Sequence, residues 1–93
     1  MTALQEKDST MTLAEILQDI HGLDTRLREL EQQYGLLSED FYTLYRLGEL
    51  EQSRDSIRWA GYYELRQERQ HTYAAALRQA SVGKDLNLQL ARK

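Results

Sequence analysis

The most constraining feature of this sequence is an unbroken spacing of apolar residues between positions 13 and 34. Steps of three and four residues alternate, which is the a/d spacing of a coiled coil, through Leu13, Ile16, Ile20, Leu23, Leu27, Leu30 and Tyr34. Thr12 and Glu15 have the spacing of a capping box, and Gly35 can take the left-handed backbone that ends a helix. The pattern predicts an amphipathic helix over residues 12–34 whose apolar stripe needs a cover.

Two further helices are predicted from start and stop signals. Ser38 is a good N-cap residue, and the two acids after it suit the first turn of a helix, so a short helix is expected over residues 39–47, ended by Gly48. Ser53 can start a third helix that runs without a strong breaker to about Ala80. The predicted fold is therefore all-α: a hairpin of two long antiparallel helices with coiled-coil-like packing and a short helix at the bend.

The length of 93 residues allows one domain, which we expect over residues 12–80. Residues 1–11 are polar and unpatterned, and they are predicted to be a mobile N-terminus. In the tail, residues 81–93, three leucines alternate with polar residues, namely Leu86, Leu88 and Leu90. That period is typical of a strand, which could add to the edge of a partner's sheet. A frayed or weakly helical tail is the other interpretation.

Composition excludes several classes of protein. The sequence has no Cys for disulfides or thiolate chemistry, no secretory signal, and no apolar run long enough to span a membrane, so a cytoplasmic location is expected. Net charge is −3, with −7 over residues 1–51 (four bases, eleven acids) and +4 over residues 52–93 (eight bases, four acids). The two halves should attract if the chain folds back on itself. The acidic balance argues against nucleic-acid binding.

The third predicted helix carries aromatic and Arg side chains on one broad stripe. Part of this stripe must cover the Leu/Ile stripe of the first helix. The stripe is wider than one helix–helix contact and includes fixed charges, and Trp, Tyr and Arg are enriched at interface hot spots. A core alone and a core combined with a partner surface are the two interpretations, and we favour the second. The candidate contacts on this helix are Trp59, Tyr62, Tyr63, Arg66, Arg69 and Tyr73.

Catalytic and metal chemistry has little support in the sequence. Glu68 and His71 have the Glu-x-x-His spacing of carboxylate-bridged metal sites, with Glu64 one turn earlier, but a second such motif is missing. These residues lie opposite the aromatic stripe, as expected of a solvated face. The sequence has no glycine-rich phosphate loop and no nucleophile with a His neighbour. We therefore predict no catalytic residue, no metal ligand and no cofactor.

Residues 27–65 resemble a group of small prokaryotic antitoxin-like helical proteins encoded beside toxin genes. The resemblance covers less than half of the chain and is carried by Tyr34, Gly35, Ser38, Glu39, Phe41, Tyr42, Gly48, Glu49, Leu50, Asp55, Trp59, Tyr62 and Tyr63. It implies a non-catalytic protein that binds and neutralises a cognate toxin. Unlike many antitoxins, this chain has no separate DNA-binding module. The alternative is a self-associating scaffold or adaptor, in which two hairpins pair as a homodimeric four-helix bundle.

Overall fold

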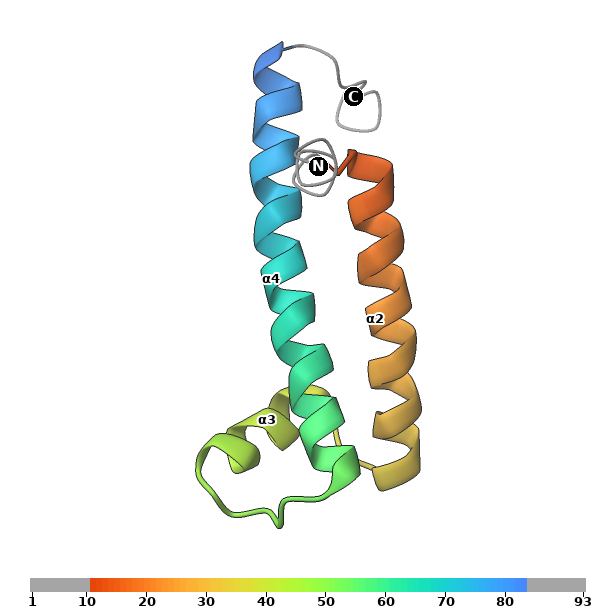
Figure 1. Cartoon of the computed structure of the whole chain (residues 1–93), viewed down its shortest axis with the longest axis vertical. Coiled ribbons are helices and arrows are strands. Elements are labelled where there is room, and N and C mark those ends of the chain that lie inside the picture. The colour runs from red at the N-terminus through yellow and green to blue at the C-terminus, as the bar shows by residue number, and fades with distance from the viewer. Residues whose placement is uncertain (1–10, 84–93) are drawn as a thin grey trace, which may run out of the picture.

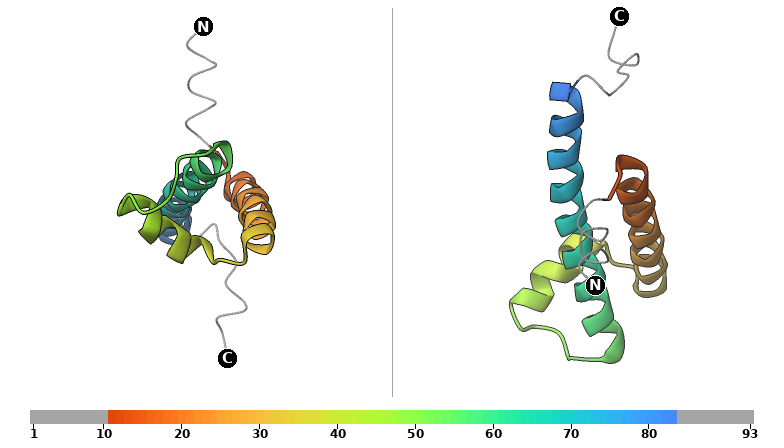
Figure 2. Two further views of the ribbon diagram at one scale, coloured as in Figure 1. Left: turned by 90° about the horizontal axis from the view of Figure 1, so that it is seen from below. Right: turned by 45° about the horizontal axis from the view of Figure 1, so that its top comes forward.

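The computed structural model describes residues 11–83, which form an all-α helical hairpin (Figure 1). The long helices α2 (Leu13–Tyr34) and α4 (Arg54–Gly83) run antiparallel, and the short helix α3 (Ser38–Arg46) lies at the bend. Because α4 has 30 residues and α2 has 22, the last turns of α4 extend past the start of α2. Figure 2 shows α3 set to one side of the pair formed by α2 and α4. The predicted fold class is confirmed.

Both ends of α2 are closed as the sequence predicts. The Glu15 backbone N–H donates to Thr12 Oγ1 at 3.1 Å, and the Thr12 N–H donates to Glu15 Oε1 at 3.0 Å, which completes the capping box. Gly35 follows the last turn in the left-handed conformation, with φ of 66° and ψ of 37°, and its N–H donates to the Glu31 carbonyl at 2.7 Å. These local signals set the length of α2 without help from the rest of the fold.

The start of α3 corrects the prediction that Ser38 is an N-cap. The helix already includes Ser38, and Leu37 takes the N-cap position without a side-chain hydrogen bond. Ser38 is buried: its N–H donates to Glu31 Oε2 at 3.0 Å, and its Oγ accepts from Trp59 Nε1–H at 2.8 Å. The prediction was wrong because the hydroxyl is used by a residue of α4 that only the tertiary fold brings near.

α4 begins with two serines that cap each other. The Ser56 N–H donates to Ser53 Oγ at 3.1 Å, and the Ser53 N–H donates to Ser56 Oγ at 2.8 Å. This arrangement is a capping box in which Ser replaces the usual Glu or Gln. The predicted start at Ser53 is confirmed, and the helix continues to Gly83, slightly past the predicted end near Ala80.

The core is concentrated where the three helices meet. Five of the seven a/d residues of α2 are buried, namely Ile16, Ile20, Leu23, Leu27 and Leu30. The last two form one cluster with Phe41 of α3 and with Trp59 and Ala60 of α4. From residue 61 to residue 80, by contrast, α4 has no buried residue. The apolar seam therefore continues along α2, whereas α4 buries fully only its first turns.

Two ion pairs link the long helices farther from the bend. Arg66 of α4 donates from Nε to Asp24 Oδ1 at 2.8 Å and from Nη2 to Oδ2 at 3.4 Å, and Arg69 donates from Nε to Asp19 Oδ2 at 2.6 Å. All four side chains are partly exposed, so each pair contributes at most about 1 kcal/mol. Because sliding one helix along the other would break both pairs together, they favour a single register. The expected attraction between the acidic and basic halves is realised here.

Residues 1–10 and 84–93 lie outside the described part of the chain. The predictions of a mobile N-terminus and of a partner-binding strand at Leu86, Leu88 and Leu90 therefore fall outside the structure. Within residues 11–83, no helix has an apolar stretch long enough to cross a bilayer.

Candidate functional site

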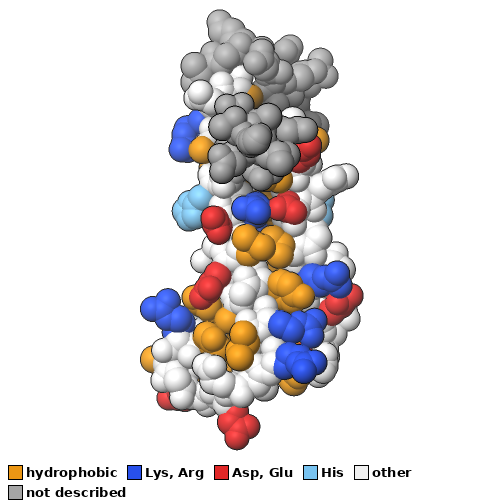
Figure 3. All heavy atoms as spheres, in the orientation of Figure 1, with side chains coloured by type: hydrophobic (Ala, Val, Ile, Leu, Met, Phe, Trp, Pro, Cys, Tyr) orange, Lys and Arg blue, Asp and Glu red, His pale blue; other side chains and the backbone are white. Residues whose placement is uncertain are grey.

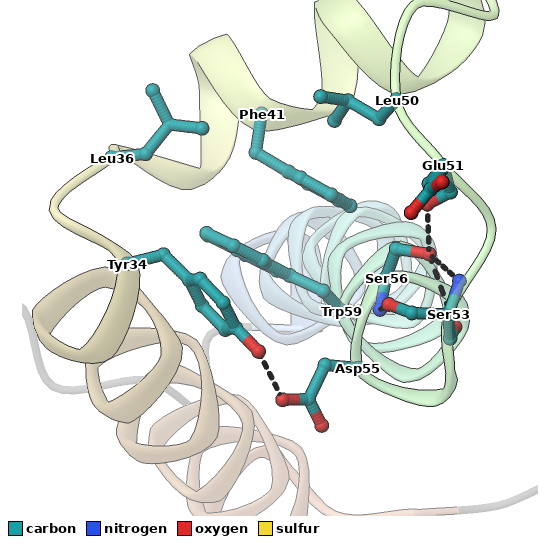
Figure 4. Close-up of a pocket in the computed structure, with 9 residues that line it drawn as sticks. All are labelled: Tyr34, Leu36, Phe41, Leu50, Glu51, Ser53, Asp55, Ser56 and Trp59. Carbon is teal, nitrogen blue, oxygen red and sulfur yellow. Dashed lines mark hydrogen bonds between the residues drawn. The ribbon is translucent and has the colours of Figure 1, made fainter.

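A half-open pocket of about 260 Å³ lies at the bend, where the end of α2, the helix α3 and the first turns of α4 come together (Figure 4). The view in Figure 4 runs along α4 from its first turn, so the pocket faces out of the bend end of the hairpin. Its lining is mostly apolar on the α2 and α3 side and polar on the α4 side. The lining residues are Tyr34, Leu36, Phe41, Leu50, Glu51, Ser53, Asp55, Ser56 and Trp59.

Three stacked aromatic rings form the rigid wall of this bend pocket. The Phe41 and Trp59 rings are nearly parallel, at 3°, with centroids 4.0 Å apart, and the Tyr34 ring stacks on Trp59 at 5.6 Å and 29°. Each ring comes from a different helix. The indole N–H of Trp59 is held by Ser38 Oγ, so its orientation is fixed by packing and by a buried hydrogen bond. Contacts within the chain thus hold the central ring of the wall in place.

The serines on the polar side are already engaged. Ser53 and Ser56 cap each other at the start of α4. The Ser56 hydroxyl also lies 3.1 Å from the Ser53 carbonyl oxygen and 3.3 Å from the Glu51 carbonyl oxygen (Figure 4). A hydroxyl has one proton to donate, and these carbonyls share it. The groups left for an outside ligand on this side are the carboxylates of Glu51 and Asp55.

Asp55 is the more constrained of the two carboxylates. The Tyr34 hydroxyl donates a hydrogen bond to Asp55 Oδ2, and Arg58 Nη1 lies 3.7 Å from Oδ1. The hydrogen bond, some desolvation and the negative charge of Asp55 raise the pKa of the Tyr34 phenol above its ordinary value, because each disfavours the phenolate. Glu51 is exposed and makes no ion pair within residues 11–83.

The bend as a whole is acidic. Residues 31–55 contain six acids and two bases, a balance of −4, although the whole chain carries only −3. The acids are Glu31, Glu39, Asp40, Glu49, Glu51 and Asp55. The segment that forms most of the pocket therefore carries net negative charge, and Arg58, just outside this segment, pairs with Asp55.

The aromatic–Arg stripe predicted to contact a partner is used mainly within the hairpin. Trp59 is buried in the core, and Arg66 and Arg69 pair with acids of α2. Tyr63 is half-buried and packs against Tyr42 of α3, with ring centroids 4.7 Å apart. Of the six candidate contacts, Trp59 is thus the one that belongs to the core, as part of the stripe was expected to do.

The other two predicted tyrosines, Tyr62 and Tyr73, are also half-buried. The Glu-x-x-His pair, Glu68 and His71, lies on the exposed side of α4, as expected. In the described part of the chain, no three Asp, Glu or His side chains lie close enough to hold a metal ion.

Most residues of the bend pocket were not recognised as site residues from the sequence. The sequence predicts a place for Tyr34 in the a/d stripe, and Tyr34 and Leu50 carry part of the resemblance, but neither is predicted as a contact residue; Leu36 and Glu51 have no predicted role. One signal was present: "YGLLSED" and "GELEQS" both place leucines beside acids at helix ends. The sequence does not show that these two segments lie side by side, because one precedes α3 and the other follows it.

Comparison with known proteins gives no relative for this chain. No protein-family model matches it, and neither a curated protein nor a solved structure is similar. The function is therefore argued from the geometry of the chain itself.

Proposed function

We propose that this chain works by binding another protein through the bend end of the hairpin. One observation carries the proposal: among residues 11–83, the large apolar side chains at least half exposed are Tyr34, Leu37, Leu47 and Ile57, at 50%, 60%, 66% and 52%. All four lie between residues 34 and 57. Single exposed apolar residues are ordinary, but their concentration at one end of a small protein is typical of an interaction surface.

The bend end has other properties of a protein-binding surface. The stacked wall of Tyr34, Phe41 and Trp59 is ordered in advance, which lowers the entropy lost on association. The pocket beside it, lined by Leu36 and Leu50 among others, offers a depression for an anchoring side chain of the partner. In the face shown in Figure 3, hydrophobic side chains gather in the lower half, with Lys and Arg side chains on both sides of them.

The resemblance of residues 27–65 to antitoxin-like proteins indicates which kind of protein the partner is. On that basis the partner is a toxin encoded by a neighbouring gene, and binding neutralises it without catalysis. The resemblance and the bend pocket fall on the same part of the chain, since Tyr34, Phe41, Leu50, Asp55 and Trp59 belong to both.

The test is co-expression with the product of the adjacent gene, followed by affinity purification through a tag on this chain. Growth arrest by the neighbour alone, relieved by co-expression, would support neutralisation. The variant Leu37→Ser with Leu47→Ser should lose the complex, because both side chains are mostly exposed and can be changed without unfolding the helices. Leu17→Ser, on α2 away from the bend, is the matched control and should retain the complex. Retention by the double variant would reject the bend surface.

The rival function is a homodimeric scaffold, and one feature favours it. Between residues 61 and 80, α4 leaves Leu65, Tyr73 and Leu77 only half-buried, and a second hairpin could cover them in a four-helix bundle. Light scattering over a range of concentrations separates the two functions. A stable dimer that binds no neighbour supports the scaffold, whereas a monomer at every concentration rules it out.

A further inference from the structure

We infer that the bend pocket takes one apolar side chain from a basic segment of a partner protein: a Leu, Ile, Met or Phe flanked by Arg or Lys. This inference rests on the proposed function and adds the chemistry of the partner. It depends on the size and lining of the pocket, on the charges around its rim, and on the absence of competing contacts at one of those charges.

The pocket has the size for one side chain. Its volume of about 260 Å³ is just under the range of about 300–1,000 Å³ typical of small-molecule sites. Leu36, Phe41, Leu50 and Trp59 line it, so a buried polar group of the ligand would find few partners on that side. An apolar side chain, in contrast, gains from leaving water in proportion to the area that it buries.

The rim then selects for positive charge beside the apolar anchor. Asp55 already has a hydroxyl donor and an Arg neighbour, so Glu51 is the carboxylate with unused capacity. A Lys or Arg next to the anchor can reach Glu51 while its aliphatic stem stays on the apolar rim. The balance of −4 over residues 31–55 adds long-range attraction for the same segment.

The same charges disfavour other occupants. Two copies of this chain docked bend to bend would bring together two segments that each carry a balance of −4, which opposes self-association at this end. Phosphate backbones and anionic lipid surfaces are repelled for the same reason. A basic protein segment satisfies both the apolar interior and the acidic rim.

A direct test uses three synthetic peptides of equal length: Leu within Arg and Ala, Ala within the same Arg context, and Leu within Glu and Ala. The chain has a single Trp, which lines the pocket, so its fluorescence and its indole N–H resonance report binding there. The basic Leu peptide should perturb both signals saturably and bind more weakly at high salt. The basic Ala peptide should bind at least about tenfold more weakly, and the acidic Leu peptide should not bind. Preference for the acidic peptide, or equal binding of the two basic ones, would overturn the inference.

Two charge reversals supply the matched variants. Glu51→Lys should weaken the basic Leu peptide by about two- to tenfold, whereas Glu49→Lys changes the net charge equally, is exposed and does not line the pocket, so it should have a smaller effect. Leu50→Phe narrows the pocket and should reduce binding of the Leu peptide, with circular dichroism confirming the helices. If the two reversals weaken binding equally, the net negative charge of the bend attracts the peptide and a contact with Glu51 does not. That result would contradict the proposed site.

The natural partner separates failure of this inference from failure of the proposed function. If Leu37→Ser with Leu47→Ser abolishes the partner complex while Glu51→Lys and Leu50→Phe leave it intact, binding at the bend stands and the pocket chemistry is wrong. If no partner binds at all, the proposed function itself fails. Loss of a homodimer in Glu51→Lys would identify a second copy as the occupant and would likewise overturn the inference.

Discussion

The hydrogen bond between Trp59 and Ser38 allows a quantitative test of how the bend is held together. The two residues are 3% and 4% exposed, and Trp59 Nε1 lies 2.8 Å from Ser38 Oγ. In Ser38→Ala the helix keeps its backbone, but the indole N–H loses its acceptor and remains buried. An unsatisfied buried donor costs about 1–3 kcal/mol, which for a domain of this size lowers Tm by about 4–24 °C.

Thermal unfolding followed by circular dichroism measures the loss, and the single Trp reports the same site by fluorescence. Thr43→Ala is the matched control, because it lies on the same helix, is exposed, and bonds only to the Glu39 carbonyl at 3.1 Å. Its free energy of unfolding should change by no more than about 0.5 kcal/mol.

A double-mutant cycle isolates the bond from other effects of the substitution. In a Trp59→Phe background the donor is gone, so Ser38→Ala should cost at least about 1 kcal/mol less than it does in the parent chain. If Ser38→Ala matches the Thr43→Ala control, or costs the same in both backgrounds, the bond does not orient the aromatic wall and the reasoning fails.

Three further substitutions test other parts of the hairpin. Gly22→Ala should stabilise α2 by about 0.5–1 kcal/mol because the site is helical and open. Gly35→Ala should destabilise α2 by about 1–2 kcal/mol because the φ of Gly35 is +66°. Urea unfolding measures both changes in the free energy of unfolding, and changes of the same sign would contradict the reasoning. Asp24→Asn should weaken the pair with Arg66 and cost at most about 1 kcal/mol, with a smaller loss in high salt. The raised pKa of Tyr34 means that its stabilising contribution is complete below the unfolded pKa and lost as pH rises through the folded one, so Tyr34→Phe should flatten the alkaline end of the stability–pH curve.

The helices themselves could be predicted because their signals are local. The a/d stripe, the Thr12–Glu15 capping box and Gly35 all act within a few residues, and the structure confirms the length of α2 from them. The opposite charges of the two halves likewise anticipated attraction between the long helices, although not the pairing of Asp24 with Arg66. Local hydrogen bonds and side-chain periodicity depend on spacing along the chain, and spacing is what a sequence displays.

The bend pocket was decided by tertiary structure alone. Trp59 reaches Ser38 across 21 positions, and Tyr34 reaches Asp55 across another 21. The sequence allowed another role for each of these residues. Ser38 could have capped its own helix, and Trp59 could have faced outward with the stripe. Which use prevailed depended on how three helix ends pack around one indole ring. The sequence by itself therefore determined the helices and their polar faces, whereas packing at the bend determined which side chains form the wall and which remain exposed.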